Sequence, residues 1–233
     1  MTIKNDQIFL FYTKILPPYG MRVLRKTSAK SKTFPEKNKN FLDVGCGNSS
    51  PTKFMNVFGK DYNYFGLDKS KYNMREVDNN KYFKIFILDL EKTNIKEVVN
   101  NTKFSVIHFS HVIEHLNNGE SVISQFRELQ PKGGLLYIET PSPESIHLKP
   151  SKEGTLNFYD DKTHKKVYSL EELEPLLIKN RYKILKSGKR KDWRRILIYQ
   201  ILIMMFILIR KPINGAMLWD INGFANFVLC EAM

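Results

Sequence analysis

Residues 41–50 read Phe-Leu-Asp-Val-Gly-Cys-Gly-Asn-Ser-Ser, and this stretch decides the fold that we predict for the chain. Its apolar start is typical of a buried strand, and the Gly-Cys-Gly that follows ends the strand in a tight turn. Ser49 and Ser50 are residues that commonly open a helix. Because Gly45 and Gly47 lack a Cβ atom, the backbone of the turn can approach a ligand closely. The stretch therefore predicts a strand, a ligand-binding turn and a helix N-terminus.

The composition is that of a globular protein with an unusual charge. The chain has 233 residues, of which 42% are hydrophobic, so it can form one α/β domain with a full core. Cys46 and Cys230 are its two cysteines and supply no disulfide framework or metal-site spacing. The N-terminal residues contain no long apolar run of the secretory type, so we expect a cytoplasmic protein. The net charge of +13 favours an anionic partner.

From residue 39 onward, short apolar runs alternate with helix-length segments, which predicts βα units on a largely parallel sheet. The expected strands cover residues 41–44, 62–67, 82–88, 104–109, 135–139, 182–185 and 224–230. We expect the last of them to be an antiparallel strand that closes the edge of the sheet. The clearest helices are expected at 119–129 and from an N-cap at Ser169 to about Lys179.

The domain boundary is predicted near residue 38. Residues 1–38 contain an apolar run, 8–16, that is broken by prolines and followed by a polar segment. This pattern predicts a short N-terminal helix and a loop, which either cover the ligand turn as a lid or pack as an appendage. Residues 39–233 then form one domain.

Polar residues follow three further strands of the predicted sheet. Asp68 ends the second strand, 21 residues after Gly47, where a carboxylate can accept hydrogen bonds from both hydroxyls of a ribose. Asp89 ends the third strand and can accept from the ring edge of a base. Ser110 and His111 end the fourth strand. Ligands of open α/β sheets bind beyond these strand ends, so the sequence predicts a nucleoside-like ligand.

Two classes of enzyme compete for this pattern. A dinucleotide enzyme would carry a third glycine three residues after Gly47, whereas the next glycine of this chain is Gly59. The acid at Asp43, together with Gly45 and Gly47, instead resembles the Asp/Glu-x-Gly-x-Gly-x-Gly signature of class I S-adenosylmethionine-dependent methyltransferases, and Ser49 departs from it at the last position. The resemblance extends over about residues 40–177 and includes the stretches 111–116 and 131–140, which match segments of the small-molecule and ubiquinone-type group.

The resemblance implies a Rossmann-like α/β fold with helices on both faces of a seven-stranded, mostly parallel sheet, and S-adenosylmethionine as the cofactor. It implies that the glycines face the methionine part, Asp68 the ribose, and Asp89 with Leu90 the adenine. Ser110 and His111 would lie on the sulfonium side. The full set of predicted cofactor-binding residues is Asp43, Gly45, Cys46, Gly47, Asp68, Asp89, Leu90 and Ser110.

Methyl transfer requires alignment of the acceptor and often a base that removes its proton. The candidate bases are His111, Glu114, His115 and His164. His164 lies in a loop after the fifth strand that would overhang an acceptor pocket. We predict His164 and His111 as catalytic residues, with His164 as the base.

The candidates also raise the question of a metal. His111, Glu114 and His115 have the i, i+3, i+4 spacing that can present several ligands to one cation. Some relatives carry Glu-x-x-Glu-His here with a distant histidine and bind a divalent metal, whereas this chain has His111 in place of the first glutamate. The candidate ligands are Glu114, His115 and His164. We favour the interpretation in which these residues orient the loop and bind no metal.

Residues 196–209 form an apolar run with basic residues on both sides. As a helix these residues span about 21 Å, which is short of the roughly 30 Å hydrocarbon core of a bilayer. The run is apolar all around, so it differs from an ordinary surface helix. We interpret it as a helical insertion, at about 192–211, that lies against an anionic membrane surface. Burial in a homodimer interface or beneath the last strand are the alternatives.

These observations predict a methyltransferase that acts on an oxygen of a glycan, a lipid-linked molecule or another small-molecule acceptor, at the inner face of the membrane. An RNA methyltransferase is the alternative within the enzymes. A non-catalytic protein that associates with membranes or binds nucleic acid is the alternative outside them. Against nucleic acid, the apolar run interrupts the basic segment, and no aromatic residues alternate with its charges.

Overall fold

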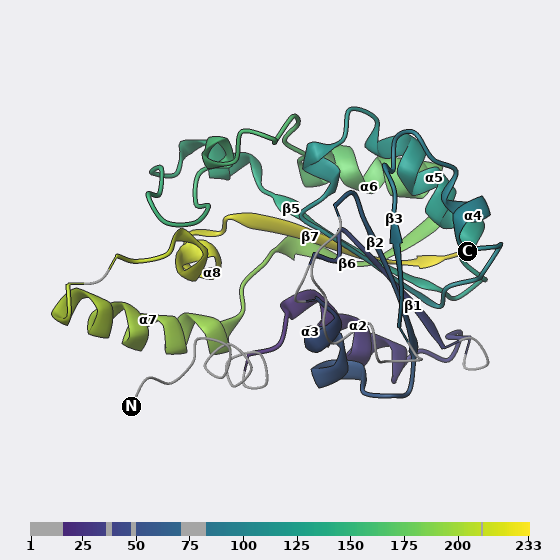
Figure 1. Ribbon diagram of the computed structural model, residues 1–233, viewed down its shortest axis with the longest axis horizontal. Helices are drawn as coiled ribbons and strands as arrows, with labels where there is room; N and C mark the ends of the chain where they lie inside the picture. The colour runs from purple at the N-terminus through teal and green to yellow at the C-terminus, as the bar shows by residue number, and fades with distance from the viewer. Residues whose placement is uncertain (1–15, 36–38, 48–49, 71–82, 211) are drawn as a thin grey trace.

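A seven-stranded sheet forms the centre of the chain, in the order β3-β2-β1-β4-β5-β7-β6 (Figure 1). In this computed structural model, the described residues are 16–35, 39–47, 50–70, 83–210 and 212–233. The strands are β1 (Asn40–Val44), β2 (Asn63–Asp68), β3 (Phe83–Ile87), β4 (Val106–Ser110), β5 (Leu135–Pro141), β6 (Tyr182–Lys189) and β7 (Ala225–Ala232). Only β7 runs antiparallel to its neighbours, β5 and β6. The predicted Rossmann-like sheet is confirmed.

The position of β7 corrects one prediction. We expected the last strand at the edge of the sheet, but it lies between β5 and β6, and β6 forms the edge. Seven of the eight residues of β7 are buried, whereas half of those of β6 are exposed. Burial on both faces is typical of an interior strand, because a layer of helices covers each face of the sheet there.

Helices cover both faces of the sheet, as predicted (Figure 1). One face carries α2 (Tyr19–Ser28) and α3 (Ser50–Phe58), and the other carries α4 (Ile95–Val98), α5 (Gly119–Leu129) and α6 (Leu170–Lys179). Each layer buries its own apolar cluster against the strands. The bounds of α5 and α6 agree with the predictions, and Ser169 caps α6 in a reciprocal pair of hydrogen bonds with Glu172.

The helix α2 occupies a segment that we predicted to be a loop. The helix contains several basic residues, but it also has an apolar face, on which Met21 and Leu24 are fully buried. Gly20 lies against the ring of Tyr137, where a Cβ atom would come within 2.4 Å of a ring carbon. The helix is therefore packed firmly on the sheet. Of the predicted N-terminal helix, residues 8–15 lie outside the described residues, so the lid remains a prediction.

The apolar run forms the predicted helix, α7 (Trp193–Leu208), which extends away from the sheet (Figure 1). It packs against the short helices η4 (Gly215–Leu218) and α8 (Trp219–Asn222). The remaining short helices are η1 (Ile113–His115), η2 (Pro143–His147) and η3 (Phe158–Asp160). Among the described residues, no helix has both the length and the apolar character that a bilayer crossing requires.

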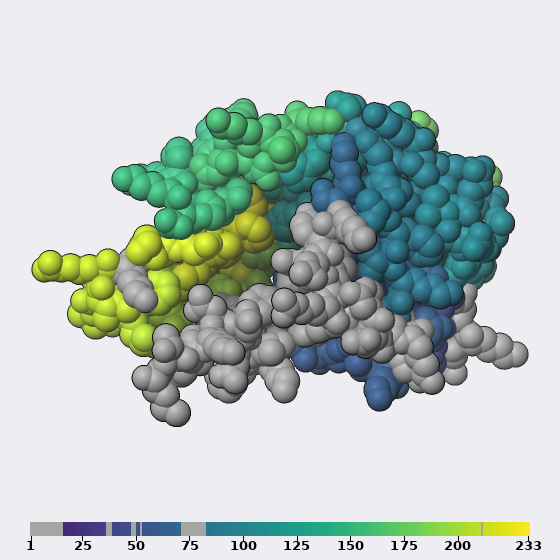
Figure 2. Space-filling view, viewed as in Figure 1, coloured from purple at the N-terminus to yellow at the C-terminus, as the bar shows by residue number. Residues whose placement is uncertain are grey.

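The segment after β5 and the C-terminal part of the chain lie side by side. The backbone N–H of Gly215 donates to the carbonyl oxygen of Glu153 at 2.7 Å, and the indole of Trp219 donates to that of Thr155 at 2.5 Å. Figure 2 shows this arrangement, with the green segment above the yellow one. These contacts place α7 and α8 beside the carboxyl ends of the central strands.

Candidate active site

Two cavities meet at the carboxyl ends of the strands. The first cavity, of about 580 Å³, lies over β1, β2 and β3, and its lining includes Gly45, Gly47, Asp68, Asp89, Leu90 and His111. The second cavity, of about 460 Å³, lies over β1, β4 and β5 and is closed by α2, α3 and α7. Its lining includes Lys53, Ser110, His111, Glu139, Arg190 and Tyr199. Both volumes are typical of small-molecule sites.

The glycine turn after β1 separates the two cavities. Gly45 and Gly47 have φ angles of +72° and +55°, which disfavour residues with a side chain. A Cβ atom on Gly45 would lie 2.2 Å from Cγ2 of Val112, whereas one on Gly47 would meet no atom within 4 Å. The turn is tied to β2, because the N–H groups of Gly45 and Cys46 both donate to the carbonyl oxygen of Leu67. Backbone at Gly47 is thus open to a ligand.

Two carboxylates are fixed on the wall of the first cavity. Asp68 accepts from the N–H of Gly47 at 2.9 Å and from the N–H of Ser70 at 3.0 Å. Asp89 accepts from the N–H of Glu91, and this hydrogen bond, with the ammonium of Lys69 at 3.2 Å, lowers the pKa of Asp89. Leucine side chains lie beside them. The cavity therefore combines ionised acceptors for hydroxyls with an apolar surface for a flat ring.

His111 is held between two buried carboxylates at the border of the cavities. Its Nδ1 lies 3.2 Å from Oε1 of Glu114, and its Nε2 lies 3.0 Å from Oε1 of Glu139. Burial alone would lower the pKa of His111, but the hydrogen bonds and charges of the two glutamates outweigh it and raise the pKa to about 9. His111 is therefore an imidazolium at neutral pH, with both N–H groups donated to protein.

Arg190 neutralises the buried acids beneath the second cavity. Its guanidinium donates to Glu139 at 2.7 Å and makes two hydrogen bonds of 3.0 Å to Asp220. Burial would raise the pKa of Glu139, but the charge of Arg190 and the hydrogen bond from His111 hold it well below its usual range. Asp220 also accepts from the N–H of Asp192, which caps α7. This network fixes α7 and α8 to β5.

Three other residues of the β1 and α3 region have distinct environments. The carboxylate of Asp43 is buried and accepts from the hydroxyl of Tyr64 and from Nδ1 of His108, each at 2.9 Å. Burial, with the charge of Asp43, raises the pKa of the Cys46 thiol to about 12, so the thiol is unreactive. Burial lowers the pKa of Lys53, which lines the second cavity.

The structure brings all eight predicted cofactor residues to the two cavities. Gly45, Gly47 and His111 line both of them. The first cavity also contains Asp68, Asp89 and Leu90, and the second contains Asp43, Cys46 and Ser110. His164 lines neither cavity: its Nδ1 donates to the carbonyl oxygen of Phe158 at 2.6 Å, and its Nε2 lies 3.9 Å from Asp161. The assigned roles remain predictions.

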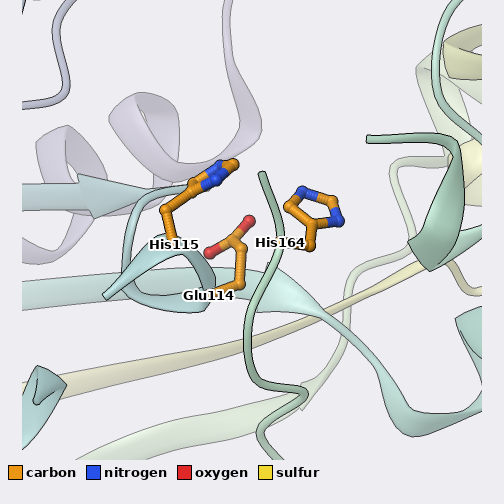
Figure 3. A group of neighbouring side chains, drawn as sticks. All are labelled: Glu114, His115 and His164. Carbon is orange, nitrogen blue, oxygen red and sulfur yellow. The ribbon is translucent and has the colours of Figure 1, made fainter. Parts of the chain in front are cut away.

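Glu114, His115 and His164, the candidate metal ligands, lie together (Figure 3). One ligand atom from each comes within 4.8 Å of the others. The oxygens of Glu114 already accept from His111 and from the hydroxyl of Thr140, each at 3.2 Å. Nδ1 of His115 lies 2.9 Å from the hydroxyl of Thr163. The two Nε2 atoms are the ring nitrogens that remain for a cation, and their rings lie 4.8 Å apart.

Sequence analysis missed the residues that build the second cavity from the C-terminal segment. Arg190, Asp220 and Trp219 lie far from the glycine turn along the chain, and the ring of Trp219 packs 4.8 Å from that of His111. In the sequence, Arg190 is one of many basic residues, although only 4% of it is exposed. A signal was nevertheless present, because Asp192 is the one acid of the basic segment 179–211.

The sheet is Rossmann-like, and two cavities meet at the carboxyl ends of its strands. A family model described as a methyltransferase domain matches residues 17–187, and the chain belongs to this family. No curated protein matches the chain at a significant level.

Solved structures share the fold. A methyltransferase dependent on S-adenosylmethionine from Archaeoglobus fulgidus has 19% identity and a TM-score of 0.53, over 97% of this chain and all of that one. A second, from Mesorhizobium loti, has 13% identity and a TM-score of 0.59, over 84% of this chain and 93% of that one. A phosphoethanolamine N-methyltransferase from Haemonchus contortus has 14% identity and a TM-score of 0.58, over 98% of this chain and 57% of that one.

The chain is a class I methyltransferase, and its cofactor is S-adenosylmethionine. The first cavity fits this cofactor on its own chemistry. The backbone at Gly47 is open, Asp68 presents a fixed carboxylate to hydroxyls, and Leu90 offers an apolar surface beside Asp89. When bound, the cofactor supplies an electrophilic methyl group.

Proposed function

We propose that the chain methylates a hydroxyl oxygen of a glycan, a lipid-linked molecule or another small-molecule acceptor at an anionic membrane surface. One observation carries the proposal: Gly45, Gly47 and His111 line both cavities. A donor in the first cavity and an acceptor in the second would therefore meet at this shared wall, where the two reacting atoms need to be aligned.

The second cavity has the character of a polar acceptor site. Lys53, Arg190 and Arg195 contribute positive charge to its wall, and Ser110 and Tyr199 contribute hydroxyl groups. Such groups can orient the hydroxyls of a sugar or the phosphate of a linked lipid by hydrogen bonds. An aromatic floor is provided by Trp219, whose ring stacks on Phe224 with a centroid distance of 4.6 Å.

The acceptor hydroxyl would need a base. His111 keeps its proton below about pH 9, so we assign it to charge balance and orientation at the shared wall. Lys53 is the amine of the second cavity, and burial lowers its pKa toward the range of a useful base. We therefore propose Lys53 as an alternative to His164, the base predicted from sequence. His164 could act only indirectly, through His115, which lines the first cavity.

Helix α7 supplies the argument for a membrane. Its inner face contributes Arg195 and Tyr199 to the second cavity. Its outer face carries an apolar stripe at helical spacing, in which Trp193 is 70%, Ile201 64% and Leu208 79% exposed; Leu197 and Met204 complete the stripe. Arg194 and Arg210 lie at its two ends and are exposed. An apolar face between cations suits the interface of an anionic bilayer.

A transfer assay tests the acceptor class. The protein would be incubated with methyl-labelled S-adenosylmethionine and, separately, with a lipid extract, a glycan pool and RNA. We expect label in the lipid or glycan fraction, as a methyl ether in the purified product. Label in RNA alone would overturn the proposed acceptor class and support the alternative of an RNA methyltransferase.

The proposed bases are compared in the same assay. Lys53→Met should reduce the rate at saturating cofactor by on the order of 100-fold and remove the rise in rate with pH that accompanies deprotonation of the base. His164→Gln should leave that rise in place. A larger loss of rate in His164→Gln than in Lys53→Met would support His164 as the base and contradict the proposal of Lys53.

A further inference from the structure

A third concavity lies outside the two cavities of the site. This basic groove, of about 670 Å³, runs between α2, β6 and the start of α7. Its cations are Arg22 and Lys26 from α2, Lys30 from the turn that follows α2, Lys186 from β6 and Arg194 from α7. No acidic residue is among the described residues that line it. Tyr19 lines both the groove and the second cavity, so the two are neighbours.

The cations of the groove are poorly compensated within the protein. Arg22 donates to Asp192, which is buried at the cap of α7. In the part of the chain that the structure describes, no ion pair joins Lys26, Lys30 or Arg194 to an acid. Arg22 and Lys26 are spaced at i and i+4 on α2, a spacing at which like charges destabilise a helix, and Lys30 adds a third cation just after the helix ends. An anion in the groove would relieve this repulsion.

The groove is continuous with the apolar stripe of α7. Arg194 belongs to the groove, and Trp193, its neighbour in the first turn of α7, begins the stripe. A concave cluster of cations beside an exposed apolar face matches the chemistry of a lipid, in which an anionic headgroup adjoins acyl chains. Extended nucleic acid would use the cations but would leave the stripe in water.

We propose that the basic groove binds the phosphate headgroup of an anionic lipid in the bilayer on which the stripe of α7 lies. This inference rests on the membrane part of the proposed function. The groove fixes the orientation of the protein on the bilayer, so that the second cavity, on the other side of Tyr19, faces lipid-linked acceptors. The site is separate from the cofactor cavity, with which it shares no residue.

Vesicle flotation of the full chain tests the proposal. The vesicles are pure phosphatidylcholine and an equimolar mixture of phosphatidylcholine and phosphatidylglycerol. We expect tighter binding to the mixture, and a loss of that preference by on the order of tenfold in the double variant Lys26→Ser/Lys30→Ser. The matched control is Lys60→Ser/Lys132→Ser, which removes two exposed lysines outside the groove and should keep the preference.

A second pair of measurements separates the groove from the stripe and from the enzyme. Leu197→Ser/Ile201→Ser should weaken binding to both kinds of vesicle. Calorimetry with S-adenosylhomocysteine should give equal affinities for all of these variants, because none of the changed residues lines the first cavity. A failure of cofactor binding would thus count against the proposed methyltransferase function, and not against lipid binding by the groove.

Several outcomes would overturn the proposal that the basic groove binds a lipid headgroup. One is an equal loss of preference in the groove variant and in the lysine control. Another is the absence of any preference for phosphatidylglycerol in the unmodified protein. A third is lysine-dependent binding of RNA without vesicle binding, which would assign the groove to nucleic acid. Dimerisation that is lost in the α7 variant, without vesicle binding, would assign the stripe to a second copy of the chain.

Discussion

The backbone N–H of Gly47 donates a 2.9 Å hydrogen bond to Oδ2 of Asp68, so the turn after β1 is fixed by the carboxylate at the end of β2. Asp68→Ala removes this bond and the proposed acceptor for the ribose hydroxyls. We expect the affinity for S-adenosylhomocysteine to fall by roughly 10- to 100-fold, measured by calorimetry, since hydrogen bonds to charged groups contribute about 1.5–3 kcal/mol. Asp61→Ala, in an exposed pair with Arg25, is the control. Equal affinities of the two variants would refute the assignment.

Gly45→Ala should disturb the same turn by a steric route. The new Cβ atom would lie 2.2 Å from Cγ2 of Val112, in addition to the strain of a φ angle of +72°. Gly59→Ala is a matched control, because Gly59 has a φ angle of +60° but no atom within 4 Å of an added Cβ. We expect Gly45→Ala to lower the free energy of unfolding by about 1–3 kcal/mol more than the control, measured in urea. An equal loss of unfolding free energy in the two variants would show that the side chain of Val112 moves aside without an energetic cost.

The core of the fold could be predicted because its signals are local. A strand such as 41–44 is a short apolar run, and α5 has both its periodicity and its terminating residues within eleven positions. Asp68 and Asp89 could be predicted as well, since the ends of parallel strands converge on one edge of the sheet. By contrast, the place of β7 between β5 and β6 depends on which edges remain unpaired. The sequence of β7 alone does not specify this.

The wall of the second cavity could not be predicted, because it is built by contacts between distant segments. Arg190 acquires its role only where β5 and α8 bring Glu139 and Asp220 to it. His164 follows the fifth strand as expected, but its ring turns toward Phe158 and His115 and lines neither cavity. The position of His164 along the chain predicts that it lies in a loop after the fifth strand. The direction of its side chain depends on the residues that pack around it.

Arg190→Met should be strongly destabilising. The substitution leaves Glu139 and Asp220 buried without their shared cation, and removal of one partner of a buried ion pair typically costs about 3–5 kcal/mol. Arg25→Met, which breaks an exposed pair with Asp61, should cost less than about 1 kcal/mol. Urea unfolding of both variants measures the difference. A small effect for Arg190→Met would show that the buried acids take up protons and tolerate the loss.

His111 should make stability depend on pH in a defined window. Its pKa is about 9 in the folded chain against an ordinary value of 6.5, so the folded state holds a proton that the unfolded state releases between these values. The stabilising contribution is therefore complete below about pH 6.5 and is lost as pH rises through 9. The difference in unfolding free energy between the unmodified chain and His111→Gln should shrink by on the order of 1–3 kcal/mol across the window. A difference independent of pH would contradict the paired imidazolium.

The last prediction concerns the group of Glu114, His115 and His164 (Figure 3). A cation there would have to compete with His111 and Thr140 for the oxygens of Glu114, since both oxygens already accept hydrogen bonds. We therefore expect methyl transfer to be unchanged by a chelator, and elemental analysis of the purified protein to find no stoichiometric metal. If a chelator instead abolishes transfer and a divalent cation restores it, His115→Ala and His164→Ala should each remove the restoration. In that case the cation would have displaced His111 from Glu114. The pKa of His111 would then fall, because one of the two carboxylates that raise it would no longer contact the ring.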